Sequence, residues 1–192
     1  MNKAQKWMIA AALPALLASC NTASEPATSI PDQPQPAPAV ACGLAAAAVT
    51  AADTCFAQQV AMSDMFEIRS SELALQRSSN DAVKAFAQQI IKDHTEASAK
   101  LKAKASSLNI SLPAGLDAAK VADMQALQVK QGMPFDRAYA AVQVNAHVDA
   151  INLFESYLAK GSNAELKAHA QETLPHLRHH LEMAHQLVLK VN

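Results

Sequence analysis

A ten-residue stretch that occurs twice constrains the fold of this chain more than any other feature. Residues 80–89 read NDAVKAFAQQ and residues 163–172 read NAELKAHAQE, so that Asn, Lys, two Ala and Gln recur in register. Each copy opens with asparagine, a residue favoured at the N-cap of a helix. Each copy also follows another segment with helical periodicity. The repeat therefore predicts two helix hairpins that close into one bundle.

The spacing of apolar residues extends this prediction to most of the chain. Apolar residues recur at intervals of three and four, as expected for amphipathic helices. The chain has only 4 glycines in 192 residues, and none lies inside an expected long helix. We therefore expect an all-α, ferritin-like antiparallel four-helix bundle with a connecting helix. The long helices are expected over residues 53–77, 81–107, 134–160 and 164–189, and the connecting helix over 116–130.

The N-terminal residues resemble a bacterial lipoprotein signal. A basic start precedes a short apolar run, which is too short to span a bilayer as a stable helix and ends in Leu-Ala-Ser-Cys at Cys20. The resemblance implies that residues 1–19 are removed and that Cys20 is lipidated. Asn21 then favours an outer-membrane anchor that faces the periplasm. The open alternative is an ordinary secretory signal that happens to end in cysteine.

Residues 20–52 are expected to form a tether between the lipid anchor and the domain at residues 53–192. Their Pro, Ser, Thr and Gln content cannot build a core. Cys42 and Cys55 flank the junction, and in an oxidising periplasm they would form either a disulfide or two free thiols. The sequence leaves both possibilities open.

The charge of the chain gives no reason to expect a nucleic-acid partner. The formal net charge is −1 and becomes more negative once Lys3 and Lys6 leave with the signal peptide. The only partner that the sequence indicates is the membrane, through the lipid anchor. A protein partner and the oligomeric state have no signal. No Gly-rich phosphate loop or nucleophile turn is present, which favours a non-enzymatic protein.

A set of polar residues is expected at one level of the bundle. Each residue lies roughly 13 to 18 positions from a turn, about midway along its helix. We expect both turns at the same end, which would bring the residues together. By helical phase, Glu67 and His94 point into the core, where an unpaired charge or imidazole costs several kcal/mol. The set comprises Glu67, His94, His147, His176 and His180.

Three interpretations of this set are possible. In the first, the imidazoles and the carboxylate bind zinc, copper or iron, with Asp93 orienting one imidazole from behind. In the second, Glu67 is hydrogen-bonded to His94 and His147, and no ion is bound. In the third, His176 and His180 simply reach solvent along an exposed edge.

Four motifs stand out along the expected helices: NDAVKAFAQ at 80–88, KDHT at 92–95, FDRAY at 135–139 and LKAHAQETLP at 166–175. Through these motifs, residues from about 54 to 187 resemble a bacterial family described as a ferritin-like domain of unknown function, whose members are exported or outer-membrane proteins. The resemblance implies the fold but no established activity. Arg69 stands where the family has a second acid, which weakens an acid-rich site.

A ferritin-type di-iron site needs two Glu-x-x-His pairs, and the chain offers one, from Glu182 to His185, which faces away from the core. Two functions therefore stay open. The leading hypothesis is a non-enzymatic envelope lipoprotein whose bundle binds a partner or ligand, or contributes to stress tolerance. The alternative is a periplasmic protein that stores, buffers or oxidises a transition metal through the His/Glu cluster.

Overall fold

The computed structural model describes residues 49–192 of the chain, and every regular element within that range is an α-helix. This confirms the all-α prediction, with helix ends displaced by a few residues. The signal peptide, Cys20 and Cys42 lie outside the described residues. The helices are α1 (Val49–Arg77), α2 (Asp81–Ser107), α3 (Ala118–Gln128), α4 (Gly132–Lys160) and α5 (Ala164–Val191).

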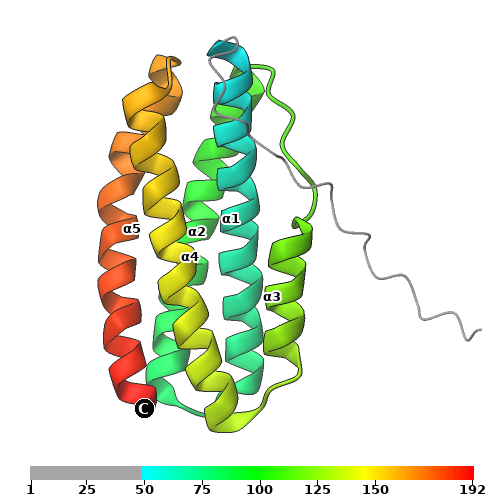
Figure 1. Ribbon diagram of the computed structural model, residues 1–192, viewed down its shortest axis with the longest axis vertical. Coiled ribbons are helices and arrows are strands. Elements are labelled where there is room, and N and C mark those ends of the chain that lie inside the picture. The colour runs from blue at the N-terminus through cyan, green and yellow to red at the C-terminus, as the bar shows by residue number, and fades with distance from the viewer. Residues whose placement is uncertain (1–48) are drawn as a thin grey trace, which may run out of the picture. The chain divides into compact units, whose positions relative to one another are not determined.

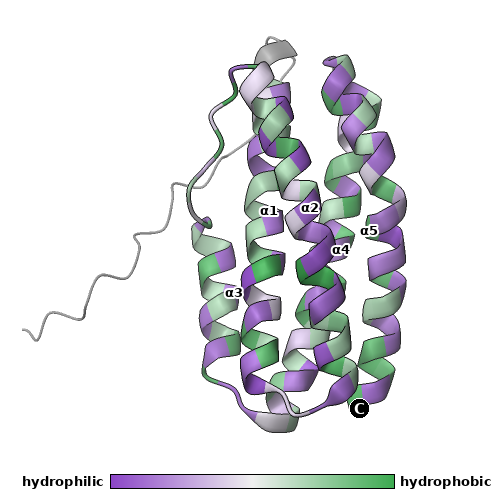
Figure 2. Cartoon of the chain, turned by 180° about the vertical axis from the view of Figure 1, so that it is seen from behind, coloured by the Kyte–Doolittle hydropathy of each residue, from purple (hydrophilic) through white to green (hydrophobic). Residues whose placement is uncertain are grey.

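Four of the helices form a bundle of two hairpins (Figure 1). Helices α1 and α2 make the first hairpin, and α4 and α5 make the second. The hairpins pack through α1 against α4 and through α2 against α5, while α3 lies outside the bundle against α1 and α4. Each long helix alternates between hydrophilic and hydrophobic residues, as its position around a common core requires (Figure 2).

The repeated stretches begin α2 and α5, and both asparagines cap their helix. The side chain of Asn80 accepts a hydrogen bond from the Ala82 amide. The side chain of Asn163 accepts from the amides of Glu165 and Leu166. The amides of a first helical turn have no partner within the helix, so these side chains supply one.

The expectation that both turns lie at the same end of the bundle is wrong. Asp53, in the first turns of α1, accepts hydrogen bonds from the backbone amides of Ser162 and Asn163 in the second turn of the chain. The first turn, at residues 78–80, follows the opposite end of α1. The connection through α3 runs back along the bundle and reverses the second hairpin (Figure 1). Reversing a hairpin exchanges the two ends of its helices but leaves their midpoints at the same height along the bundle. The polar residues predicted near the helix midpoints are therefore still expected to meet.

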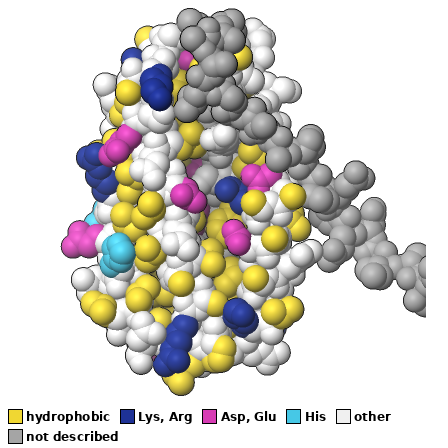
Figure 3. All heavy atoms as spheres, in the orientation of Figure 1, with side chains coloured by type: hydrophobic (Ala, Val, Ile, Leu, Met, Phe, Trp, Pro, Cys, Tyr) yellow, Lys and Arg dark blue, Asp and Glu magenta, His cyan; other side chains and the backbone are white. Residues whose placement is uncertain are grey.

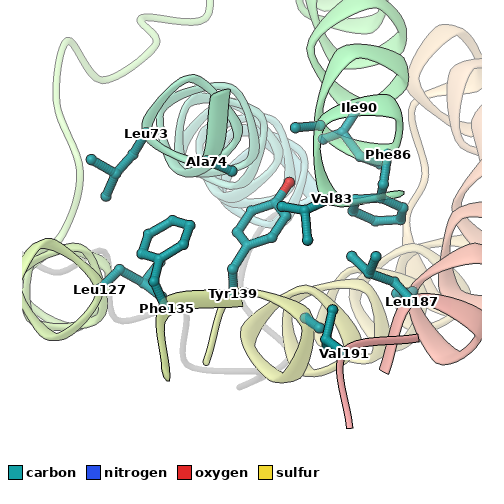
Figure 4. Close-up of a cluster of buried hydrophobic side chains, with 13 residues drawn as sticks. Leu73, Ala74, Val83, Phe86, Ile90, Leu127, Phe135, Tyr139, Leu187 and Val191 are labelled. Atoms are coloured by element: carbon teal, nitrogen blue, oxygen red, sulfur yellow. The ribbon is translucent and has the colours of Figure 1, made fainter. Parts of the chain in front are cut away.

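The core consists of two apolar clusters separated by a polar layer. One cluster includes Phe86, Phe135 and Tyr139 (Figure 4). The other includes Phe56 and Phe154. Buried polar side chains fill the stretch between the clusters on all four bundle helices. These side chains include Asp64, Glu67 and Ser70 on α1, His94 on α2, Gln143 and His147 on α4, and His180 on α5.

Two observations concern the envelope predictions. Cys55 in α1 is disulfide-bonded, and because Cys42 lies outside the described residues, the pairing of these two cysteines stays a prediction. None of the helices within residues 49–192 combines the length and the apolar character needed to cross a membrane.

Candidate metal centre

Three histidines from three helices meet in the polar layer. His94 of α2, His147 of α4 and His180 of α5 are each less than 5% exposed. Their ring centroids are 5.4 to 5.7 Å apart. One ring nitrogen from each histidine lies within 4.8 Å of the corresponding nitrogens of the other two. We call these residues the histidine triad.

Two members of the triad are held through Nδ1. The Nδ1 of His94 lies 2.9 Å from Oδ1 of Asp64 on α1. The Nδ1 of His147 lies 2.8 Å from the carbonyl oxygen of Gln143, one turn earlier on the same helix. A carboxylate and a carbonyl oxygen only accept, so Nδ1 carries the proton in both rings. The lone pair of each neutral ring is therefore on Nε2.

His180 is held in the opposite sense, through Nε2. This nitrogen lies 2.9 Å from Oδ2 of Asp93 on α2, so the lone pair of neutral His180 is on Nδ1. Asp93 is itself fixed by a hydrogen bond of 2.6 Å from the side-chain amide of Gln89. Burial acts to raise the pKa of Asp93, but the hydrogen bonds from Gln89 and His180 outweigh it and lower the pKa. Asp93 therefore stays a carboxylate and keeps accepting the proton of His180.

The three nitrogens that carry the lone pairs of the neutral rings have no hydrogen-bond partner. They are Nε2 of His94, Nε2 of His147 and Nδ1 of His180, and all three are buried. A buried polar atom without a partner costs free energy. Three imidazoles that converge, each held at one nitrogen by an acceptor, have the donor set and supporting contacts of a transition-metal site.

Glu67 of α1 adds a carboxyl group to the same layer. The residue is 1% exposed, and neither side-chain oxygen has a hydrogen-bond partner. Its Oε1 lies 3.9 Å from Nδ1 of His147. Burial raises the pKa of Glu67 to about 7, although the charge of His94 opposes the rise. Of the predicted pairing of Glu67 with His94 and His147, the structure contains the contact with His147 at ion-pair distance, but no hydrogen bond from Glu67 to either histidine.

The protonation of the triad follows from the same contacts. Burial lowers the pKa of His147 to about 4, with a further contribution from the charge of His94. Burial also lowers the pKa of His180 to about 4, against the hydrogen bond to Asp93. In His94, burial lowers the pKa, but the hydrogen bond and charge of Asp64 outweigh it and raise the pKa. His147 and His180 thus keep their lone pairs at neutral pH.

The structure brings together Glu67, His94, His147 and His180 from the predicted set. Asp93 accepts a hydrogen bond from Nε2 of His180, which is the kind of imidazole contact predicted for it. His176 lies one turn from His180 but is exposed, and it does not join the triad. Histidine side chains reach the surface along the α5 edge of the bundle (Figure 3).

Sequence reasoning missed Asp64 and Gln143, which hold His94 and His147. Asp64 lies four residues after buried Val60 and three before Glu67, so helical phase places it on the buried face of α1. That signal was available in the sequence. The contact made by Gln143 uses its backbone carbonyl, and every residue has one, so the sequence carries no signal for it.

Two solved structures share this fold. The first is CopM in the Cu(II)-bound form, with 18% sequence identity and a TM-score of 0.62, over 73% of this chain and 97% of that chain. The second is CopM in the Ag-bound form, prepared by co-crystallization, with 19% identity and a TM-score of 0.59, over 72% of this chain and 96% of that chain. At these identities the similarity establishes the fold alone. Among curated proteins no match was found. The family described as domain of unknown function DUF4142 matches residues 38–187, and the chain belongs to that family.

Proposed function

We propose that this protein is a non-enzymatic metal-binding protein whose bundle binds one copper ion in the histidine triad. The ligand atoms are Nε2 of His94, Nε2 of His147 and Nδ1 of His180. One observation carries the proposal: each of the three buried histidines brings one ring nitrogen within 4.8 Å of the other two, and Nε2 of His94, Nε2 of His147 and Nδ1 of His180 have no hydrogen-bond partner. A bound ion supplies the partner that all three lack.

The donor set favours copper among the transition metals. Imidazole suits zinc, copper, iron and nickel, and divalent copper binds most tightly of these at a given nitrogen site. The carboxyl group of Glu67 offers a negative charge next to the triad, which offsets part of the charge of a cation. The similar structures of CopM contain Cu(II) and Ag, which supports a copper-group ion in this fold.

The burial of the site favours storage, buffering or delivery over catalysis. A catalytic metal keeps a coordination position open to its substrate. Here each histidine of the triad is less than 5% exposed, and the fourth bundle helix, α1, contributes buried Glu67 to the same layer. Such a site can exchange an ion, but a space of about 130 Å³ beside it leaves little room for an organic substrate. In this proposal the term ferritin-like describes only the arrangement of the two hairpins. The proposal does not include di-iron chemistry, because Glu182 and His185 are both exposed.

The cellular location is a separate part of the proposal. We place the copper-binding bundle at the outer membrane, facing the periplasm, held by acyl chains on Cys20. The Leu-Ala-Ser-Cys sequence supports this placement. Radiolabelled palmitate should enter the wild-type protein and should not enter a Cys20→Ala variant. Equal labelling of the two would disprove the anchor but would leave the copper site untouched.

Elemental analysis tests the metal site. The full chain, purified without a histidine tag and dialysed against Cu(II), should retain about one copper per chain. His147→Gln should lose that copper while circular dichroism shows unchanged helicity. His185→Ala is the matched control, because His185 is also on α5 but exposed and away from the triad. Wild-type protein that retains no copper, zinc or iron disproves the proposal.

A further inference from the structure

A cavity lies next to the histidine triad and is lined by all four bundle helices. Its volume is about 130 Å³, which is space for several water molecules. His94 and His180 line it, whereas His147 and Glu67 do not. The triad therefore has one side that faces a solvent-sized space, and that side carries two of its three ligands.

His169 of α5 lines the same cavity and has no evident structural partner. It is 1% exposed, and neither of its ring nitrogens has a hydrogen-bond partner. Its nearest ring is Phe154, at 6.3 Å between centroids. Burial lowers the pKa of His169. The cavity thus contains a neutral imidazole whose nitrogens are unpaired, in addition to the two triad members.

His176 joins the cavity to the solvent. It lines the cavity and is exposed, and it lies one helical turn from His180 on the same face of α5. His169, His176 and His180 therefore form a line of imidazoles about 16 Å long, taking 1.5 Å per residue. The middle member reaches the surface, and one end is a triad ligand.

The remaining charged groups of the lining favour a cation. Asp64, Asp93, Glu96 and Glu172 all line the cavity, and among the described residues Lys100 is the single lysine or arginine that does so. Lys100 and Glu172 form an ion pair of 2.6 Å with both side chains more than half exposed, which places them at the rim. An excess of acidic groups raises the local concentration of cations.

We infer that this cavity is the exchange chamber of the metal centre, in which His176 holds a copper ion transiently on its way to and from the triad and His169 offers the ion a second position away from the triad. The inference rests on the proposed function, since the chamber serves the triad. His176 captures the ion at the rim, one turn from His180. His169 provides a second temporary ligand at the far end of the chamber. Neither residue belongs to the resting site.

Stopped-flow kinetics on the full chain tests this role. Uptake is measured by mixing metal-free protein with Cu(II) sulfate, and release by mixing copper-loaded protein with excess EDTA, both followed by the visible absorbance of bound Cu(II). In a His169→Leu/His176→Leu double variant, both rates should fall about tenfold, the factor for a barrier higher by about 1.4 kcal/mol. The equilibrium affinity and the stoichiometry should stay at their wild-type values, because a higher barrier along the path of the ion slows uptake and release by the same factor.

Two results would overturn the inference. Unchanged rates would show that the ion does not pass these histidines. A loss of affinity with unchanged uptake would make them ligands of the resting site. If the double variant loses helicity, His169→Asn and His176→Gln are tested singly against the same two rates, with His185→Ala as the control. Failure of the proposed function is distinguishable, because wild-type protein would then hold no copper at all.

Discussion

Asp64 and His94 form a buried hydrogen bond that joins α1 to α2 beside the triad, with 2.9 Å between Oδ1 and Nδ1. The other oxygen of Asp64 accepts a hydrogen bond of 3.1 Å from Ser98. The carboxylate is thus fixed on both sides. It determines which nitrogen of His94 carries the proton and directs the lone pair on Nε2 toward the other histidines.

The first prediction is that Asp64→Asn weakens copper binding about 10- to 100-fold, the usual effect of losing a carboxylate behind a metal-bound imidazole. The neutral amide is a weaker acceptor and lowers the basicity of His94. Competition titration against a chelator of known affinity measures the change. Asp149→Asn is the control, because Asp149 is exposed on α4, and its affinity should match that of wild type. Equal affinity in both variants would refute a supporting role for Asp64.

The local features of the fold could be predicted from the sequence, but the direction of the second hairpin could not. Asn80 and Asn163 identify the starts of α2 and α5 because capping depends on residues within one turn. The path of the connection depends instead on how α3 packs against α1 and α4. Those contacts join residues far apart in the sequence, and no local pattern encodes them.

The candidate site, too, could be predicted where it depends on local pattern and not where it depends on contacts between helices. Glu67 and His94 could be assigned to the core because helical phase determines which face is buried. His176 and His180 share one face of α5, and the packing of α5 against its neighbours leaves His180 buried and His176 exposed. The protonated nitrogen of each ring depends on its acceptor across the bundle, which periodicity does not specify.

The second prediction concerns the pH dependence of stability in metal-free protein. Burial raises the pKa of Glu67 from 4.5 to about 7. Below pH 4.5 the carboxyl group of Glu67 is protonated in both the folded and the unfolded state, so its ionisation does not change the free energy of unfolding. As the pH rises to 7, the unfolded chain ionises first, so wild-type protein loses stability that a Glu67→Gln variant keeps. The free energy of unfolding of the variant, relative to wild type, should increase by on the order of 3 kcal/mol between pH 4.5 and 8.

Thermal unfolding in EDTA, followed by circular dichroism, measures this difference. Glu72→Gln on the exposed face of the same helix is the control and should show no such trend. A difference between Glu67→Gln and wild type that stays constant across the pH range would mean that Glu67 does not change its protonation on folding.

The third prediction concerns the second turn. Gly161 has an ordinary backbone φ of −67°, but a Cβ built there would lie 2.4 Å from Cε2 of Tyr157. The Tyr157 ring cannot retreat, because it stacks on Phe56 at 3.9 Å between centroids and donates a hydrogen bond to Asp53. Gly161→Ala should therefore lower the free energy of unfolding by about 1–3 kcal/mol, as overpacking does.

Urea denaturation measures that loss. Gly115→Ala is the matched control, because a Cβ at Gly115 meets nothing within 4 Å, and its stability should stay close to that of wild type. Copper stoichiometry should be unchanged in both variants, since the turn lies at one end of the bundle and the triad in the middle. Equal stability of the two variants would show that the Tyr157 ring has room to move.

The fourth prediction concerns the rim of the cavity. Lys100→Gln removes the cation that pairs with Glu172 and leaves the acidic groups of the lining unbalanced. Cu(II) uptake should become about two- to tenfold faster at low salt, because a more negative rim attracts the ion more strongly. The gain should shrink as ionic strength rises and screens the charges. Stopped-flow uptake at several salt concentrations measures this, with Lys102→Gln as the control, because Lys102 is exposed on α2 but does not line the cavity. An uptake rate that is the same in both variants at low salt would place the entry of copper elsewhere on the bundle.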